Sequence, residues 1–201
     1  MRNLKSATLP VTAMAAFAAT AAFSLDALAA PEEYKLDPAH TYVVFKVDHI
    51  GYSQAIGRFN EVEGSFVFDE EEPSISDLNV TIQAESVDTN HEERDEHLRS
   101  GDFLDVENHP EITFVMTGSE QTDDRTGKIM GDLTILDTTR EVTLDVTWNA
   151  SKPYPFGENY VTGASASTSI NRSDFGMNYG VEGGMIGDSV DIEIEIEAIR
   201  Q

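Results

Sequence analysis

The sequence predicts an all-β fold, an eight-stranded antiparallel barrel with one short α-helix. Residues 190–198 alternate strictly between apolar and acidic side chains, as a strand with one buried and one solvated face does. Similar alternation recurs along the chain without long helices in between, and sheets covered on one face only are typically antiparallel. Such a sheet buries its apolar face by folding onto itself, and about eight strands are typical of a barrel that can hold one small ligand.

The first 29 residues predict a cleaved secretory signal peptide, which leaves residues 30–201 as one β-barrel domain. Arg2 and Lys5 precede an apolar run over residues 9–23, and Ala27 and Ala29 form a small-residue cleavage site. A membrane anchor is the alternative, but the run ends before about 20 apolar residues accumulate. We therefore expect an exported protein of a single domain.

Composition excludes several function classes. The chain has no cysteine, which excludes a disulfide framework, a thiolate metal site, a Cys nucleophile and a lipid-modified N-terminal Cys. We therefore expect no stable membrane insertion. The formal net charge of −24 repels nucleic acid and anionic membranes, so nucleic acid is not an expected partner. Most acidic side chains are interpreted as a solvated surface.

Three strands and the helix are expected in the first half of the domain. Residues 42–49, 64–68 and 78–84 alternate as strands, and Gly51 and Gly57 indicate a bend between the first two.

Capping-box spacings that begin at Thr89 and Asn90 indicate a helix, which Gly101 is placed to end. Because Leu98 is its only strong apolar residue, this helix is expected to be a short plug or flap rather than a structural pillar.

Five further strands are expected over residues 112–116, 129–135, 142–148, 160–170 and 190–198. The inner row of the strand at residues 160–170 is expected to be Ala164, Ala166, Thr168 and Ile170, which is small where the neighbouring rows are large. Small inner residues leave room inside a barrel. The long glycine-containing stretch over residues 175–187 is typical of a binding loop or lid.

The inner rows of these strands form the predicted ligand-binding site. Its apolar members are Val43, Phe45, Val47, Val80, Ile82, Phe114, Met116, Ile135, Leu144, Val146, Trp148, Ala166, Ile170, Ile192, Ile194 and Ile196. His49, Asn171 and Arg172 are the candidate contacts to a ligand head group, although His49 fits a hydrogen-bonded buried histidine equally well. Arg172 and Asp174 also suit a charge pair that closes one barrel end. The alternative is a lumen filled by its own aromatic rings.

Metal and enzyme chemistry find little support in the pattern. His91 and His97 are six residues apart, about 600° around a helix, so they lie on different faces and are interpreted with His109 as surface or capping residues. No Gly-x-Ser-x-Gly elbow, phosphate loop or zinc signature is present. We expect no catalytic residue, cofactor or metal. A hydrolase-type enzyme and a secreted stress-response module without ligand remain alternatives.

A series of short motifs carries a family resemblance that spans nearly the whole mature chain. The motifs are LDPAHT (36–41), VVFKVDH (43–49), SVDT (86–89), RDEHLRSGDFLD (94–105), HPEITF (109–114), GDLTI (131–135) and INRSDFGM (170–177). In this order they resemble the bacterial YceI-like, polyisoprenoid-binding periplasmic proteins.

The resemblance implies a lipocalin-like barrel in the periplasm that encloses a long apolar ligand, such as a polyisoprenoid, a quinone-type lipid or a fatty acid or amide. No catalytic activity comes with it. Asp137, Glu141 and Leu104 depart from the usual pattern at a turn and a packing position, and this leaves the identity of the lipid open. The sequence also leaves open whether the protein forms a homodimer.

Overall fold

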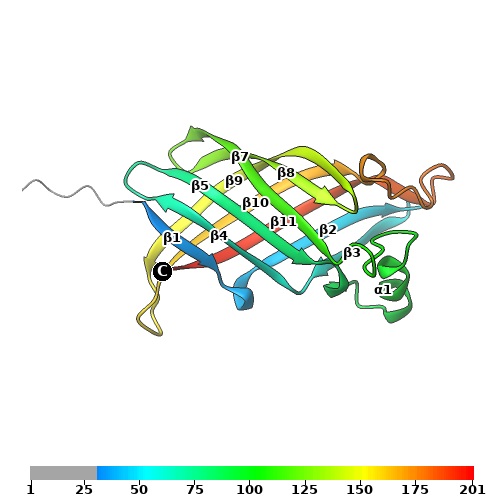
Figure 1. The fold of residues 1–201 in the computed structure, drawn as a ribbon, viewed down its shortest axis with the longest axis horizontal. Coiled ribbons are helices and arrows are strands. Elements are labelled where there is room, and N and C mark those ends of the chain that lie inside the picture. Colours follow the sequence, from blue (N-terminus) through cyan, green and yellow to red (C-terminus); the bar gives the residue numbers. More distant parts are fainter. Residues whose placement is uncertain (1–30) are drawn as a thin grey trace, which may run out of the picture.

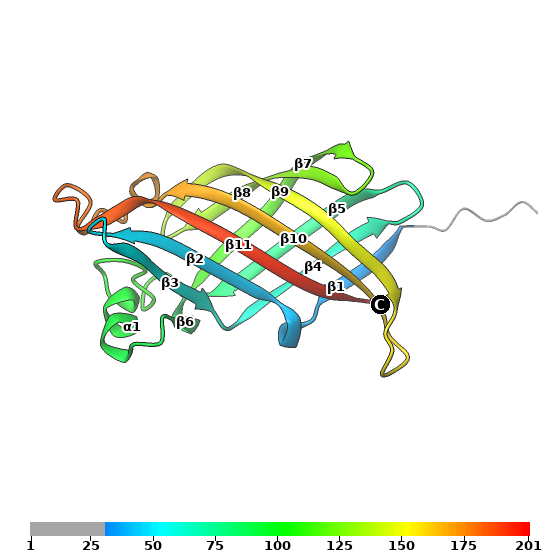
Figure 2. The ribbon, with the colours of Figure 1, turned by 180° about the vertical axis from the view of Figure 1, so that it is seen from behind.

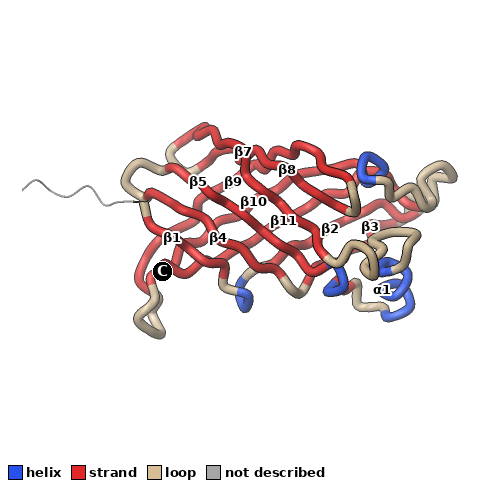
Figure 3. Tube along the Cα trace, in the orientation of Figure 1, coloured by secondary structure: helices blue, strands red, loops and turns tan. Residues whose placement is uncertain are grey.

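The computed structural model describes residues 31–201, so the predicted signal peptide lies outside the described residues. The chain is mostly β-strand, with one α-helix in this range (Figure 3). The elements are β1 (Glu32–Leu36), β2 (Tyr42–His49), β3 (Ser53–Phe59), β4 (Val62–Asp69), β5 (Ser74–Gln83), β6 (Val87–Asp88), α1 (Glu92–Arg99), β7 (Glu111–Asp123), β8 (Thr126–Ile135), β9 (Thr138–Pro153), β10 (Tyr160–Asn171) and β11 (Ile186–Arg200). Short 3-10 helices cover Pro38–His40, Ala84–Ser86 and Arg172–Phe175.

Eight strands close a ring in the order β1, β4, β5, β7, β8, β9, β10 and β11, because β11 pairs with β1 as well as with β10 (Figure 1). All pairs are antiparallel. The predicted fold class, an eight-stranded antiparallel barrel with one short helix, is confirmed. The strands that form the ring differ from the prediction in one respect. β1 closes the ring, whereas β2, which was predicted as a barrel strand, lies beside it.

The length of β11 allows it to serve two neighbours on the same edge. Its C-terminal residues 198–200 pair with β1, whereas residues 186–195 pair with β2. From β2 the sheet continues through β3 to the short β6, as the rear view shows (Figure 2). The helix α1 and the loop between β10 and β11 lie together at one end of the barrel (Figure 1). We call this end the α1 mouth.

Alternation along β11 produces the wall that the sequence predicted. Ile192, Ile194 and Ile196 face the lumen, and the acidic residues between them lie outside. On the outer side Glu193 accepts a 2.7 Å hydrogen bond from Lys46 of β2. One dry face and one wet face therefore coexist on a single strand.

Three strands were not predicted, namely β1, β3 and the two-residue β6. β1 is short and mostly polar, and β3 contains Gly57, which was interpreted as part of a bend. Gly57 instead pairs with Phe45 of β2, and a Cβ at this position would collide with the Phe45 ring. Glycine is thus needed inside the strand for the ring to lie across it.

The helix starts later than predicted. His91 is the N-cap, and its ring accepts a hydrogen bond from the Arg94 amide at 3.3 Å. Thr89 is not available for capping, because its hydroxyl donates to the Asp95 carboxylate. The helix ends at Arg99, with Ser100 rather than Gly101 at its C-cap.

Candidate functional site

The barrel lumen contains a continuous cavity of about 550 Å³. This volume lies within the range of about 300–1,000 Å³ that is typical of small-molecule sites. Aromatic rings line the cavity without filling it, so the alternative of a lumen packed solid is wrong. The predicted site residues that border the cavity are Val43, Phe45, Val47, His49, Val80, Ile82, Phe114, Ile135, Leu144, Val146, Trp148, Ala166, Ile170, Arg172, Ile192, Ile194 and Ile196.

The small residues of β10 leave the space. Ala166 borders the cavity between Ile194 of β11 and Val146 of β9, its two cross-strand partners. Ala164 and Thr168 border the same cavity. A row of small side chains between rows of large ones leaves a void that the neighbouring residues do not reach across.

Aromatic side chains that border the cavity pair with one another. Phe45 and Phe59 lie with ring centroids 5.7 Å apart. At the other end of the barrel, Phe68 and Trp148 form an edge-to-face pair at 5.3 Å. Such geometries are favourable for aromatic pairs.

Two predicted site residues lie elsewhere. Met116 packs against the hydrophobic core but does not border the cavity. The register of β7 and β8 shifts immediately after it. Asn171 is exposed and donates a 3.4 Å hydrogen bond to Asp174. It is the last residue of β10, where the alternation of the strand ends.

Arg172 borders the cavity at the α1 mouth and is 4% exposed. The predicted charge pair with Asp174 is not formed. Its guanidinium donates instead to four backbone carbonyls, those of Gly187, Met177 and Tyr179 at 2.8 Å and that of Ile186 at 3.1 Å. Arg172 thus anchors the loop that precedes β11. Burial lowers the pKa of Arg172 from its ordinary value, and the charge of Asp188 opposes this.

An aromatic cluster connects α1 with that loop. The His97 ring lies 5.0 Å from the Phe103 ring and 4.9 Å from the Tyr179 ring, edge-on to both. The Arg172 guanidinium lies 5.9 Å from the centroid of Phe103. His97 also borders the cavity, although the sequence pattern indicated only a surface or capping role. No periodic signal marks these residues, because they meet only in the folded barrel.

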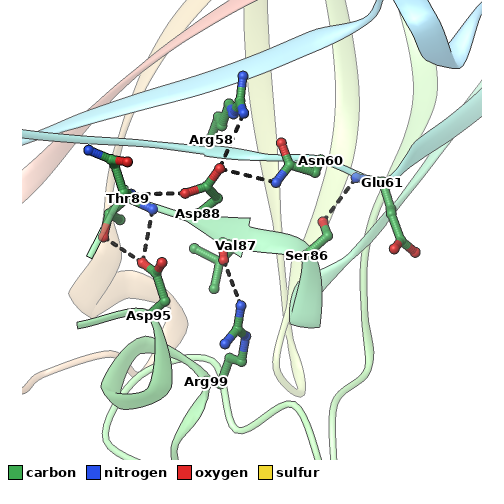
Figure 4. Close-up of polar contacts among 10 residues, drawn as sticks. Arg58, Asn60, Glu61, Ser86, Val87, Asp88, Thr89, Asp95 and Arg99 are labelled. Atoms are coloured by element: carbon green, nitrogen blue, oxygen red, sulfur yellow. Dashed lines mark hydrogen bonds and ion pairs between the residues drawn. The ribbon is translucent and has the colours of Figure 1, made fainter. Parts of the chain in front are cut away.

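Polar contacts attach α1 to β6 (Figure 4). The buried carboxylate of Asp95 accepts from the amide of Thr89 at 2.9 Å and from its hydroxyl at 2.5 Å. Arg99 donates to the carbonyls of Glu85 and Val87 at 2.8 and 2.9 Å. Leu98 packs against the core, in agreement with the plug that the sequence predicted.

Different side chains interact near the opposite mouth. Glu70 accepts hydrogen bonds from Tyr34 at 2.5 Å and from Tyr160 at 2.9 Å. Burial and this hydrogen bond raise the pKa of Tyr34, which is fully buried. Arg125 lies over the Trp148 ring at 5.6 Å and borders the cavity.

One group of side chains outside the cavity has the composition of a metal site. Asp37, His40 and Glu197 bring potential ligand atoms together on the outer surface. Nδ1 of His40 lies 2.7 Å from Asp37 and 3.8 Å from Glu197. The hydrogen bond between His40 and Asp37 raises the pKa of His40 and lowers that of Asp37. The contacts among these three residues are explained by a capping hydrogen bond and an ion pair.

A family model described as the YceI-like domain matches residues 34–198. The chain belongs to the YceI-like family. This range includes all the strands from β2 to β10 and most of β1 and β11. Curated relatives of this YceI-like protein include a UPF0312 protein of Pectobacterium carotovorum, 38% identical over 98% of this chain and 99% of the relative. Another is a UPF0312 protein of Pseudomonas aeruginosa, 38% identical over 94% of this chain and 97% of the relative.

Solved structures show the same barrel. The YceI protein of Campylobacter jejuni has a TM-score of 0.71 at 29% identity, and the match covers 77% of this chain and 90% of the C. jejuni protein. BcnA of Burkholderia cenocepacia has a TM-score of 0.72 at 20% identity, over 81% and 98% of the two chains. A polyisoprenoid-binding domain of Saccharophagus degradans has a TM-score of 0.62 at 14% identity, over 84% and 98%. Among residues 31–201 of the YceI-like chain, no helix is long and apolar enough to cross a membrane.

Proposed function

We propose that this protein binds a long-chain lipid, an isoprenoid or a similar molecule, inside the barrel, and that it carries or sequesters this lipid in the periplasm. The observation that carries the proposal is the continuous cavity of about 550 Å³ bordered by inner rows of isoleucine, valine, leucine and phenylalanine. Membership in the YceI-like family supports it, and one structural neighbour is described as a polyisoprenoid-binding domain.

Burial of a hydrocarbon tail is strong enough to drive such binding. Each methylene moved from water into an apolar cavity contributes about 0.8 kcal/mol, so a tail of about fifteen carbons contributes roughly 12 kcal/mol before any cost. Association and ordering of the ligand subtract about 4 to 15 kcal/mol. Micromolar affinity therefore needs little help from the head group.

The periplasmic role depends on the signal peptide predicted over residues 1–29, which export and N-terminal sequencing of the mature protein would test. The carrier role needs no reaction. Accordingly we assign no catalytic residue, cofactor or metal to the cavity.

Native mass spectrometry tests lipid binding directly. The mature protein is purified without added lipid, weighed under non-denaturing conditions, and weighed again after extraction with organic solvent. We expect an additional mass that disappears on extraction and is recovered in the solvent as a long-chain lipid. A protein with the bare chain mass that also takes up no added long-chain prenol or fatty acid would contradict the proposal and favour a module without ligand.

A further inference from the structure

Arg172 is the only buried basic residue in the part of the chain that the structure describes. Buried charges in proteins are normally compensated by an opposite charge. Over the same residues, no carboxylate lies within ion-pair distance of Arg172, although the chain has 37 acidic and only 13 basic residues. The carboxylate of Asp188, whose charge acts on Arg172, is occupied by the amide and hydroxyl of Ser173 at 2.9 and 2.8 Å.

The carbonyl partners of Arg172 satisfy its hydrogen bonds but not its charge. A guanidinium has five N–H donors, and four hydrogen bonds to backbone carbonyls are formed. One donor is left over, on a side chain that borders the largely apolar cavity. An anion at the end of the cavity would accept from this donor and neutralise the charge.

A second arginine lies at the same mouth. Arg94 of α1 borders the cavity and donates to the hydroxyl and the carbonyl of Thr89, both at 2.7 Å. It too has no carboxylate partner within the described residues. His97 follows three residues later, which places the two side chains on the same side of the helix.

His97 and His49 are each linked to Arg172 through a shared neighbour. His97 and Arg172 both contact the Phe103 ring. On the other side, His49 of β2 pairs with Ile186 of β11, and the Ile186 carbonyl accepts from Arg172. His49 borders the cavity as well.

The two mouths differ in charge. At the opposite mouth, the acidic residues Glu120, Asp123 and Asp124 outnumber Arg125 and Lys128. Lys128 is moreover bound to the Asp145 carboxylate at 2.7 Å.

At the α1 mouth, Asp48 is the carboxylate that borders the cavity, and it accepts from the amide of Gly51 at 2.9 Å. Asp102 lies 3.0 Å from His97. Among the residues that border the cavity, arginines therefore outnumber carboxylates at the α1 mouth, whereas carboxylates outnumber basic residues at the opposite mouth.

We propose that the ligand of the barrel is a single-chain lipid with an anionic head group, a phosphate monoester or a carboxylate, which binds at the α1 mouth to Arg172 and Arg94. His49 and His97 supply further hydrogen bonds to this head group. The inference rests on the proposed function, because the tail occupies the lumen. It also names the end of the barrel at which the head group lies.

Three ligands with the same fifteen-carbon tail test the proposal: farnesyl phosphate, farnesoic acid and farnesol. Affinities are measured by isothermal titration at low salt on delipidated protein. We expect the better anionic ligand to bind about tenfold or more tightly than the alcohol. Whichever of farnesyl phosphate and farnesoic acid binds more tightly identifies the head group as a phosphate or a carboxylate.

The same three ligands distinguish a wrong head group from a barrel that binds no lipid. If farnesol binds as tightly as both anions or more tightly, the anionic head group is wrong and the lipid-binding barrel stands. This outcome is what the net charge alone would produce, because the acidic surface repels anions. If none of the three ligands binds, the proposed function itself fails.

Variants assign the preference to the arginines. Arg172→Gln and Arg94→Gln should each reduce the ratio of anion to alcohol affinity several-fold, whereas Arg172→Lys should retain most of it. Lys152→Gln removes the same charge from a residue that does not border the cavity, and it should leave the ratio unchanged. Since Arg172 also anchors a loop, Arg94→Gln provides the test if Arg172→Gln does not fold. If Arg94→Gln and the folded Arg172 variants leave the ratio of anion to alcohol affinity unchanged, the assignment of the head group to these arginines is wrong.

Discussion

Small side chains on β10 determine that the barrel is hollow. Ala164, Ala166 and Thr168 border the cavity, and their partners on β11 are the isoleucines of its inner row. Larger residues at these three positions would fill the space that a lipid tail needs. The function of the barrel therefore depends as much on what these residues lack as on the apolar residues that surround them.

A pH-dependent contact joins His40 and Asp37 near the start of the barrel. Their hydrogen bond raises the pKa of His40, so its contribution is complete below the ordinary histidine pKa of about 6.5 and is lost as the pH rises through the raised value. The pKa of Asp37 is lowered, so its contribution is present above about 4 and is lost as the pH falls through the lowered value.

We predict that His40→Gln lowers the melting temperature most between about pH 4 and 6.5, where both contributions are present. The difference from the wild-type protein should shrink toward pH 8 and toward pH 3. Thermal unfolding followed by circular dichroism over this range measures it. A difference that is constant with pH would show that the two groups are not coupled in the way the structure indicates.

Inner residues could be predicted from sequence wherever a strand alternates without interruption. Val43, Phe45 and Val47 were placed correctly in this way. Met116 follows the same alternation as Ile112 and Phe114 but does not border the cavity, and a β-bulge, which no local pattern marks, comes directly after it. Arg172 was placed at the barrel end, but its carbonyl partners belong to a loop whose path depends on the whole fold.

Among the elements, α1 depends on polar contacts more than on apolar packing. Asp95 is 7% exposed and accepts two hydrogen bonds from Thr89. The helix segment is flanked by Asn90 and Asp105, both with a positive φ, of 59° and 44°. Non-glycine residues in this conformation are strained and need support from their surroundings.

Asp95→Asn should weaken the attachment of α1 by about 1–3 kcal/mol, because both hydrogen bonds from Thr89 go to one carboxylate oxygen and the uncharged amide oxygen of asparagine accepts them more weakly. Hydrogen–deuterium exchange is expected to rise over residues 91–104 and to change little in β9 and β10. Glu96→Gln, an exposed substitution on the same helix, is the matched control. Equal protection of α1 in both variants would contradict a helix held mainly by Asp95.

The helix itself was predictable, because capping residues and a glycine bracket a polar segment, but its N-cap was not. Thr89 and Asn90 both suit a cap, and the choice of His91 depends on the bond from Thr89 to Asp95. β1 and β3 were missed for a related reason. Their sequences have little alternation, and only pairing with distant strands makes them part of the sheet.

For the whole molecule, the net charge of −24 predicts that salt stabilises the fold. Repulsion between acidic side chains opposes the compact state, and the Debye length falls from about 10 Å at 0.1 M to about 3 Å at 1 M. Salt also weakens surface ion pairs such as Lys46–Glu193 and Lys128–Asp145, but each is worth at most about 1 kcal/mol. The melting temperature should therefore rise between 0.02 and about 1 M NaCl. A flat or falling curve would show that the acidic groups do not repel each other appreciably.

The hollow lumen is the central claim, and the binding of farnesyl ligands to Ala166→Trp tests it most directly. This variant places an indole in the cavity, whereas Ser167→Trp places the same side chain on the exposed face of the same strand. We predict that both variants fold, that Ser167→Trp binds as the wild-type protein does, and that Ala166→Trp loses binding. A folded Ala166→Trp that binds with wild-type affinity would contradict a lipid site inside the barrel.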